Sequence, residues 1–454
     1  MNGSTLQIDR SYGESVIDVL RSPLNTAQAV SGSDVFHKVM ETYVTQILRV
    51  GLGLVMTIMV ARILGPHGRG LYAVALAIGS LGVQFGNCGL ASSNVYYVAK
   101  DRRLLAVLAG NALVVSFLVG GVGALATWVA FSLWPKLAPV HGTILSLALV
   151  VIPFSLSYTL LQSLLLGVLD VRGYNKIELA NKVLSVVLVV TLWVFKFITV
   201  EAMLSGFVLG QITSFVWVLR RIRFLAAPAR PKLSLSLLLE HVGLASRAYL
   251  VLLFSFLVLR VDLLMVQYML GAERAGQYSV AASMADYVAM LPVVAGTILF
   301  PKLSAMTDMR EKLRLVKKAA FFIGILMLPV VILSALLARP LTVVLFGNSY
   351  LPATQAFVWL MPGIFFLAIE CVAVQFLNSM GYPCSVVITW LACMSVNISV
   401  NFWAIPVYGI VGASLNSSIT YILASVLIFW IISKTGRAAG CGLSPLKVYP
   451  CIPR

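Results

Sequence analysis

Charged residues are scarce in this sequence. Only 11% of its 454 residues are Asp, Glu, Lys or Arg, whereas 60% are hydrophobic. Ordinary soluble domains have a charged share of about a quarter. Because apolar runs recur along nearly the whole chain, most of its surface must face lipid rather than water. This composition excludes most classes of soluble enzyme.

The sequence also lacks patterns for metal binding and for disulfide bridges. Six cysteines are present, but they show neither the spacing of a metal site nor a framework of paired bridges. Cys88, Cys371, Cys384 and Cys393 lie within or beside apolar segments, where a lone cysteine behaves mostly as a small hydrophobic residue. We therefore expect no metal and no cofactor.

Nothing in the sequence indicates a catalytic site. The loops between the apolar segments that we assign below to the outer side of the membrane are all short, so neither an outer catalytic domain nor a large polar cap can be built there. No pair of carboxylates of the kind used in general acid and base catalysis stands out. We therefore expect that the protein is not an enzyme.

Apolar stretches of about 20 residues predict an all-α integral membrane protein, because a helix of that length crosses a bilayer. The first 35 or so residues lack the apolar core and cleavage site of a secretory signal, so the first helix should act as an uncleaved signal. We expect about twelve helices, near 39–64, 70–98, 105–133, 143–168, 177–196, 200–219, 245–270, 276–300, 316–338, 355–380, 384–405 and 409–432.

The net charge of +17 comes mostly from the loops between these helices. Of the 33 Lys and Arg residues, 25 lie in the tails and in loops on one side of the membrane, and 6 lie on the other side. By the positive-inside rule, this bias places both termini in the cytoplasm. We expect no nucleic-acid partner, because no folded basic face remains for one. The most basic loops, 220–232 and 308–318, are interpreted first as topological anchors and second as contacts for anionic lipid head groups.

One segment of the sequence is repeated. LGPHGRGLYAVA, which begins at Leu64, recurs as LGAERAGQYSVA from Leu270, with six identical residues at a constant offset of 206. Gly173 and Gly381 keep nearly the same offset, 208. A duplication of six helices returns the chain to the same side of the membrane, so we predict two homologous six-helix lobes in parallel orientation around a central cavity. Such bundles work by alternating access, with the substrate between the lobes.

The two lobes are expected at 39–219 and 245–432. A basic cytoplasmic linker at 220–244 joins them, and cytoplasmic tails occupy 1–38 and 433–454. A channel is the competing interpretation of a duplicated bundle, but the sequence shows neither a filter-like run of backbone ligands nor a ring of like charges.

Several charged residues lie inside predicted helices or near the start of the first. A charge at the centre of a bilayer costs about 3 kcal/mol, so each should face a cavity or a partner. Arg260 and Asp286 both lie roughly 15 Å deep and are well placed to pair. Asp262 is about 200° around the helix from Arg260 and must find another neighbour. The full set is Arg49, Arg260, Asp262, Asp286, Glu370 and Glu41.

Arg49 is expected to be the more available cation, because no acidic residue lies three or four positions away on its own helix. A guanidinium group suits a diphosphate, since it offers two parallel hydrogen bonds and stays charged when desolvated. An ion pair that joins the lobes is the alternative role. Further candidates for substrate binding are Arg260, Asn94 and Gln267, the last two also as interhelical hydrogen-bonding groups. Candidates for ion pairs, or for coupling to Na⁺ or H⁺, are Asp262, Asp286, Glu370 and Glu41.

Three segments together resemble the polysaccharide-biosynthesis flippases. These are the O-antigen and exopolysaccharide translocases of the superfamily that also holds the lipid II flippases and the multidrug and toxin extrusion transporters. The segments are ARILGPHGRGLYAVA with the preceding Arg49, LFPKLSAM at the end of the eighth helix, and VLFGNSYLPATQAFVWLMPG at 344–363. The resemblance covers about 40–435. It places Arg49 at the family's basic first-helix position and Arg260 with Asp262 in its charged seventh helix.

This resemblance implies a function. It predicts a V-shaped pair of lobes with a cationic cavity, which flips an undecaprenyl-diphosphate-linked oligosaccharide from the inner to the outer leaflet of a bacterial inner membrane for polysaccharide export. The implied partners are the membrane, this lipid-linked substrate, a polysaccharide polymerase and a chain-length regulator. If Arg49 holds the diphosphate, Arg49→Ala should abolish polymer export and Arg49→Lys should restore part of it. Some family members have fourteen helices, but the tail here is too short and polar for two more.

Two other transporter families match parts of the sequence. A cation-coupled multidrug exporter of the same superfamily would need acidic or aromatic cavity walls, and Asp262, Asp286 and Glu370 keep this alternative open. A major-facilitator transporter also has twelve helices in two parallel halves. Its characteristic loop after the second helix contains conserved glycines, however, and the loop here is AKDRRLLA.

Overall fold

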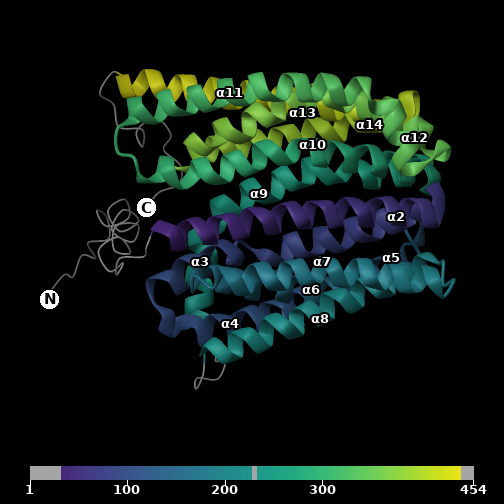
Figure 1. Ribbon diagram of the computed structural model, residues 1–454, viewed down its shortest axis with the longest axis horizontal. Helices are drawn as coiled ribbons and strands as arrows, with labels where there is room; N and C mark the ends of the chain where they lie inside the picture. The colour runs from purple at the N-terminus through teal and green to yellow at the C-terminus, as the bar shows by residue number, and fades with distance from the viewer. Residues whose placement is uncertain (1–31, 227–232, 441–454) are drawn as a thin grey trace.

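The computed structural model describes residues 32–226 and 233–440, which form an all-helical bundle (Figure 1). Ten helices in this part of the chain are long and apolar enough to cross a membrane. Two of them, α2 and α14, each consist of two helices joined at a bend, which brings the crossings to the predicted twelve. The main helices are α2 (Gly32–Asn87), α3 (Leu90–Lys100), α4 (Leu105–Val114), α5 (Gly120–Leu133), α6 (Gly142–Gly167), α7 (Val171–Val194), α8 (Val200–Ala226), α9 (Leu235–Leu270), α10 (Ala272–Ala305), α11 (Met309–Leu336), α12 (Ala338–Phe346), α13 (Leu351–Asn378) and α14 (Cys384–Gly440), with the short turns η1 (Arg102–Leu104), η2 (Val115–Val119), η3 (Pro135–Leu137) and η4 (Asn348–Tyr350).

The bends in α2 and α14 each lie at one glycine. Gly65 has φ 65° and ψ 179°, and Gly409 has φ 62° and ψ −144°, conformations that favour a residue without a side chain. Pro66 follows the first bend and begins the next helix, where its missing N–H is not needed. The helix predicted to start at residue 70 therefore starts earlier and already includes Arg69.

The helix predicted at 70–98 is interrupted near its end. Cys88 and Gly89 both have positive φ, 45° and 77°, so the regular helix stops before them. Its last part is the separate helix α3, which continues to Lys100.

The helix predicted at 177–196 begins six residues earlier, at Val171. Its start is fixed by Asp170, whose carboxylate accepts a hydrogen bond from the backbone N–H of Gly173 at 3.1 Å. This is the usual arrangement of an aspartate at a helix N-cap. The same carboxylate accepts a hydrogen bond from Arg221 Nε at 2.8 Å, which ties α7 to α8. The earlier start places more of the polar first turns of α7 inside the bundle than the sequence pattern indicated.

The structure contains the two predicted lobes. Helices α2 to α8 form the lower bundle in Figure 1, and helices α9 to α14 form the upper one. The repeat found in the sequence has the same backbone shape in both copies, because Gly65 (φ 65°, ψ 179°) and Gly271 (φ 83°, ψ 177°) adopt nearly the same conformation. The duplication is thus visible in the backbone as well as in the sequence.

The two copies of the repeat cross each other at very close range. A Cβ atom added to Gly70 would lie 1.8 Å from the carbonyl oxygen of Ala272, and one added to Gly276 would lie 1.8 Å from that of Pro66. The contact is reciprocal, since Ala272 and Pro66 are themselves separated by the repeat offset of 206. Side chains are excluded at both glycines, so the crossing brings α2 and α10 together backbone against backbone.

This crossing lies at the end of the bundle that also carries α12, at the right of Figure 1; we call it the far end. A latch between the lobes reinforces it. Arg62 of α2 donates hydrogen bonds to the carbonyl oxygens of Leu345, at 2.8 Å, and of Val344, at the C-terminal end of α12. Tyr350 donates one to the carbonyl oxygen of Ala61 at 2.8 Å. The last carbonyl groups of a helix have no N–H partner within that helix, so the guanidinium group of Arg62 supplies the missing hydrogen-bond donors at the end of α12.

The opposite end, at the left of Figure 1, carries the start of α2, the end of α14 and the basic residues of η1; we call it the basic end. It is the end that the sequence predicts to be cytoplasmic. The lobes touch there as well, because the hydroxyl of Tyr249 on α9 donates to the carbonyl oxygen of Phe85 on α2 at 3.1 Å.

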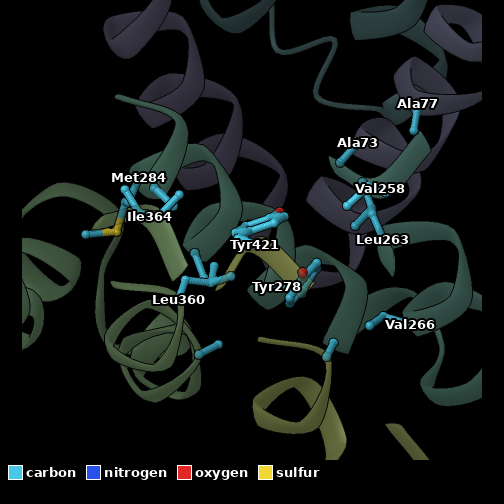
Figure 2. Packing of buried hydrophobic residues seen from close by; sticks show 14 of the residues in the cluster. Ala73, Ala77, Val258, Leu263, Val266, Tyr278, Met284, Leu360, Ile364 and Tyr421 are labelled. Carbon is cyan, nitrogen blue, oxygen red and sulfur yellow. The ribbon is translucent and has the colours of Figure 1, made fainter. Parts of the chain in front are cut away.

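Buried apolar side chains hold the lobes together. One large cluster joins α2 and α6 to the whole second lobe, and Figure 2 shows Ala73 and Ala77 of α2 in the same core as Tyr278 and Tyr421. Large hydrophobic side chains on the outside, such as Trp193, are exposed, as expected for a surface that faces lipid. The core therefore lies inside the lobes and at the far half of their interface.

Candidate functional site

A cavity of about 700 Å³ lies between the lobes. Helices α2, α6, α7 and α8 form one wall, and helices α9 and α10 form the other. Three cationic side chains line it, Arg69, Lys182 and Arg260, together with one carboxylate, Asp262. Hydroxyl and amide groups fill the space between these charges, from Ser80, Gln84, Ser155, Thr159, Gln211 and Ser283.

Arg69 is the most deeply buried cation of the cavity, with 7% of the residue exposed. Its guanidinium group lies 3.4 Å from the hydroxyl of Ser283 and 5.8 Å from the ring centre of Tyr72, within the range of a cation–π contact. Its Nε is buried without a hydrogen-bond partner, and among the described residues no carboxylate forms an ion pair with it. A buried charge without a counter-charge is costly, so this position favours an anionic ligand.

Arg49 is not the most available cation, contrary to the prediction from the sequence. It forms an ion pair with Glu178 of α7, and it does not line the cavity. The prediction failed because it considered only acidic residues on the helix of Arg49. Glu178 is 129 positions away, in the first turns of a helix that begins earlier than predicted.

Lys182 is a neighbour of this ion pair that also lines the cavity. It lies four residues after Glu178 on α7, so the two side chains share a helix face. Lys182 is within electrostatic range of both Arg49 and Glu178. One carboxylate thus faces two cations, and the cavity wall of the first lobe keeps a net positive charge.

The predicted pair of Arg260 and Asp286 is confirmed. The guanidinium Nη2 of Arg260 lies 2.9 Å from the carboxylate of Asp286, and both side chains remain partly exposed. Arg260 also lines the cavity, but its positive charge there is balanced by Asp286.

Asp262 has the neighbours that its position on the helix required. It is only 3% exposed, and its carboxylate accepts hydrogen bonds from the hydroxyl of Tyr278, from Ser417 Oγ at 3.0 Å and from the backbone N–H of Leu263 at 2.8 Å. These donors come from α10, α14 and α9. Because Asp262 also lines the cavity, it connects that space to three helices of the second lobe.

Two of the predicted substrate-binding residues, Asn94 and Gln267, lie away from the cavity. Asn94 Nδ2 donates to the carbonyl oxygen of Leu160 at 3.2 Å inside the first lobe. Gln267 Nε2 donates to the carbonyl oxygen of Pro139 at 3.0 Å and connects the two lobes. Both act as interhelical hydrogen-bonding groups in this structure.

Glu370 also lies outside the cavity lining. Glu370 is 2% exposed within the second lobe, and its Oε1 has no hydrogen-bond partner among the residues that the structure describes. Glu41 belongs to α2, but its side chain lies outside the described residues.

The prediction from the sequence missed Arg69, Lys182 and Glu178. Arg69 had been assigned to a loop, because the helix that holds it was predicted to start at residue 70, whereas Lys182 and Glu178 lie inside the helix predicted at 177–196 and were not singled out. The repeat contained a usable signal for Arg69. Its counterpart 206 positions later is Ala275, so the two copies differ by a full charge at a site that both bury.

Residues 59–355, well over half of the chain, match the sequence profile of a family described as polysaccharide biosynthesis protein. A putative O-antigen transporter from Shigella flexneri is 25% identical over 174 residues, a match that covers 38% of this chain and only 42% of that protein. The lipopolysaccharide biosynthesis protein WzxC of Escherichia coli strain K12 is 26% identical over 430 residues, which is 86% of this chain and 79% of that protein.

Solved structures share the fold. A lipid II flippase, MurJ, in an inward closed conformation aligns with a TM-score of 0.68 at 15% identity, over 92% of this chain and 94% of that one. An inward-facing multidrug resistance transporter of the MATE family aligns with a TM-score of 0.70 at 14% identity, over 90% of this chain and 100% of that one. At such low identity these structures establish the architecture of the chain and leave its cargo open.

Proposed function

The chain belongs to the polysaccharide biosynthesis protein family, within the superfamily of multidrug, oligosaccharidyl-lipid and polysaccharide exporters, and from this premise we propose that it flips a lipid-linked oligosaccharide. The proposed substrate is a diphosphate-linked sugar on an undecaprenyl chain, which enters from the basic end and leaves toward the far end. No bond of the substrate is made or broken in this process. We place the protein in a bacterial inner membrane, where a polysaccharide polymerase and a chain-length regulator would use the exported unit.

The observation that carries this proposal is the buried guanidinium group of Arg69. It lines the cavity with an unused N–H, and no carboxylate in the described ranges 32–226 and 233–440 forms an ion pair with it. A diphosphate offers the oxygens that a guanidinium fork binds best, and Lys182 adds a second positive charge to the same wall. The hydroxyl and amide groups of the cavity suit the hydroxyls of a sugar, which exchange hydrogen bonds with water for equivalent ones with the protein.

The geometry of the two ends supports alternating access. The far end is closed by the crossing of Gly70 and Gly276 and by the latch of Arg62 and Tyr350. Export requires these contacts between the lobes to separate. Because a buried apolar cluster also joins the lobes at this end, opening requires that substrate binding favour the open far end over the closed one.

We propose Asp262 as the carboxylate that couples transport to H⁺ or Na⁺. Unlike Glu370, it lines the cavity, and unlike Asp286, it forms no ion pair within the part of the chain that the structure describes. It accepts hydrogen bonds from the hydroxyls of Tyr278 and Ser417, so an ion bound to it would act on helices α10 and α14 through this carboxylate. An ion there would change how these helices pack, which is the differential contact that coupling requires.

A cation-coupled multidrug exporter is the second candidate, and Asp262 is the observation that favours it. An organic cation would be drawn to this carboxylate and to the ring of Tyr158 in the cavity wall. Arg69 and Lys182 oppose it, because both would repel a cation from the opposite wall. The two candidates therefore make opposite predictions for Arg69.

The test is complementation of the source strain from which this gene has been deleted. Arg69→Ala should reduce surface polysaccharide about tenfold to a hundredfold at normal protein level, the effect of losing a hydrogen-bonded charge. Arg69→Lys should restore part, since it keeps the charge and loses the fork. Arg274→Ala is the matched control, because this arginine lies in the other copy of the repeat and contacts Gln277 rather than the cavity. Normal export by the Arg69→Ala variant, or resistance to organic cations that this variant increases, would overturn the proposal.

A further inference from the structure

A second hollow, of about 400 Å³, lies on the outer face of the second lobe. We call it the α11 groove, and it is lined by α11, α13 and α14. Along α11 its lining includes Lys317, Phe321, Gly324 and Leu328, which share one face because they follow each other at three or four positions. Ile369 of α13 and Phe429 of α14 form the opposite side. The groove is apolar along its length, and its single charged lining residue is at one end.

The shape of the groove fits an extended hydrocarbon chain. Gly324 lies in its floor, where a Cβ atom would lie 3.5 Å from Ile369 Cδ1, an ordinary contact distance, so a longer side chain would extend into the groove. From Lys317 to Leu328 the helix rises roughly 16 Å, at about 1.5 Å per residue. This is about half of the 30 Å hydrocarbon core of a bilayer. The groove therefore matches an acyl chain of one leaflet.

The charge at one end of the groove fits an anionic head group. Lys317 lies toward the basic end, where α11 also carries Arg310 and Arg314. Leu313 of α11 contacts Gly436 near the end of α14, so Arg437 lies in the same region. Among the described residues no carboxylate forms an ion pair with Lys317. A cluster of basic residues at the membrane surface attracts anionic lipids.

The occupant is distinct from the transported substrate. The groove and the cavity share no lining residue, and α11 does not contribute to the cavity. A lipid whose phosphates are held at Arg69 cannot also place them at Lys317 on the outside of the second lobe. We propose that the α11 groove binds one anionic phospholipid of the leaflet at the basic end, with an acyl chain along α11 and its phosphate at Lys317. This inference stands whatever the cavity transports.

The experiment is native mass spectrometry of the full-length protein in detergent with added phosphatidylglycerol or phosphatidylethanolamine. The protein should retain phosphatidylglycerol in preference. Lys317→Gln should lower its retention at least threefold and leave phosphatidylethanolamine unchanged. Lys318→Gln is the matched control, because this neighbouring lysine lies over the ring of Phe322 and does not line the groove. Gly324→Leu should lower the retention of both lipids, since it fills the groove without removing a charge.

Three outcomes would overturn the proposal. Equal losses in the Lys317→Gln and Lys318→Gln variants would mean that the surface attracts anionic lipid without a specific site. Unchanged retention in both the Lys317→Gln and Gly324→Leu variants would mean that the groove is not the site. Displacement of phosphatidylglycerol by undecaprenyl phosphate, sensitive to Gly324→Leu, would assign the groove to the substrate tail instead. Lys317→Gln alters one exposed side chain, so the test does not depend on whether Gly324→Leu folds.

Discussion

The two lobes share a backbone plan but present opposite chemistry to the cavity. The first lobe contributes two cations, Arg69 and Lys182, and its nearest carboxylate is already paired outside the cavity. The second lobe contributes a carboxylate, Asp262, and a cation, Arg260, that is balanced by its own partner. An anionic group is therefore drawn to the first lobe, and a small cation to the second.

The repeat shows how few positions create this difference. At the offset of 206, Arg69 corresponds to Ala275, Asp262 to Met56 and Asp286 to Ser80. The glycines that shape the crossing between the lobes are identical in both copies, so the scaffold stayed symmetric. The charged residues differ at separate positions in each half, which is the arrangement expected if, as proposed, one lobe binds the substrate and the other a coupling ion.

The largest loss of transport is expected when the second lobe loses Asp262, its cavity-lining carboxylate. Asp262→Asn keeps the size of the side chain and removes the charge that a coupling ion would neutralise. We expect transport driven by an ion gradient to be abolished in proteoliposomes, with substrate binding retained. Glu370→Gln is the control, because it removes another buried carboxylate of the same lobe that does not line the cavity. Equal losses in both variants would show that the effect is one of folding.

A smaller effect should follow when the first lobe is made to resemble the second. Ser80→Asp places a carboxylate in the first-lobe wall at the position that corresponds to Asp286. It should weaken export about tenfold, which corresponds to about 1.4 kcal/mol of repulsion between the new charge and the diphosphate. Ser80→Asn, of the same size without the charge, should export normally. An equal defect in the Asn variant would point to size rather than charge.

The ion pair of Arg49 and Glu178 tests whether the first lobe needs each of its charges. Arg49→Gln should lower stability by about 1 kcal/mol, because it breaks the ion pair of a carboxylate whose side chain is 18% exposed and leaves only Lys182 as a nearby cation. The double variant Arg49→Gln/Glu178→Gln should recover most of this loss and most of the export. Thermal unfolding of the purified variants measures the first effect, and polysaccharide export the second. If the double variant exports no better than the single one, Arg49 acts on the substrate directly after all.

The sequence was sufficient for the architecture and for one of the charge pairs. Apolar runs and a constant repeat offset predicted twelve crossings in two lobes, since both features follow from the thickness of a bilayer and from duplication. Arg260 and Asp286 were predicted to pair because they lie at equal depths on either side of a tight turn.

The partners of the other charges could not be predicted in this way. Glu178 and Arg49 are 129 positions apart, and Ser417 and Asp262 are 155 apart, so only the packing of the lobes brings them together. Arg69 was missed for a local reason. The turn before it is a single glycine, Gly65, and a hydropathy pattern does not distinguish a one-residue turn from a polar loop.

The smallest predicted effect concerns a turn at the basic end that the lobes cap differently. Asp170 caps α7 and pairs with Arg221, whereas the residue 208 positions later is Asn378, which donates to Gln375 at 3.3 Å. The hydrogen bond from Arg221 lowers the pKa of Asp170 in the folded protein, and the Gly173 N–H lowers it further. The folded state therefore favours the carboxylate form, and this stabilisation is present above the unfolded pKa of about 3.9.

The stabilisation should be lost as the pH falls through the lowered pKa of folded Asp170. Asp170→Asn removes it at every pH, while the amide still caps the helix. At pH 7 we expect the variant to be less stable by 1 kcal/mol at most, since the Arg221 side chain is 39% exposed and solvent screens the pair. Thermal unfolding curves of the two proteins should converge as the pH is lowered toward 3. Asn378→Asp, which adds a carboxylate at the equivalent turn of the second lobe, should not gain stability as the pH rises.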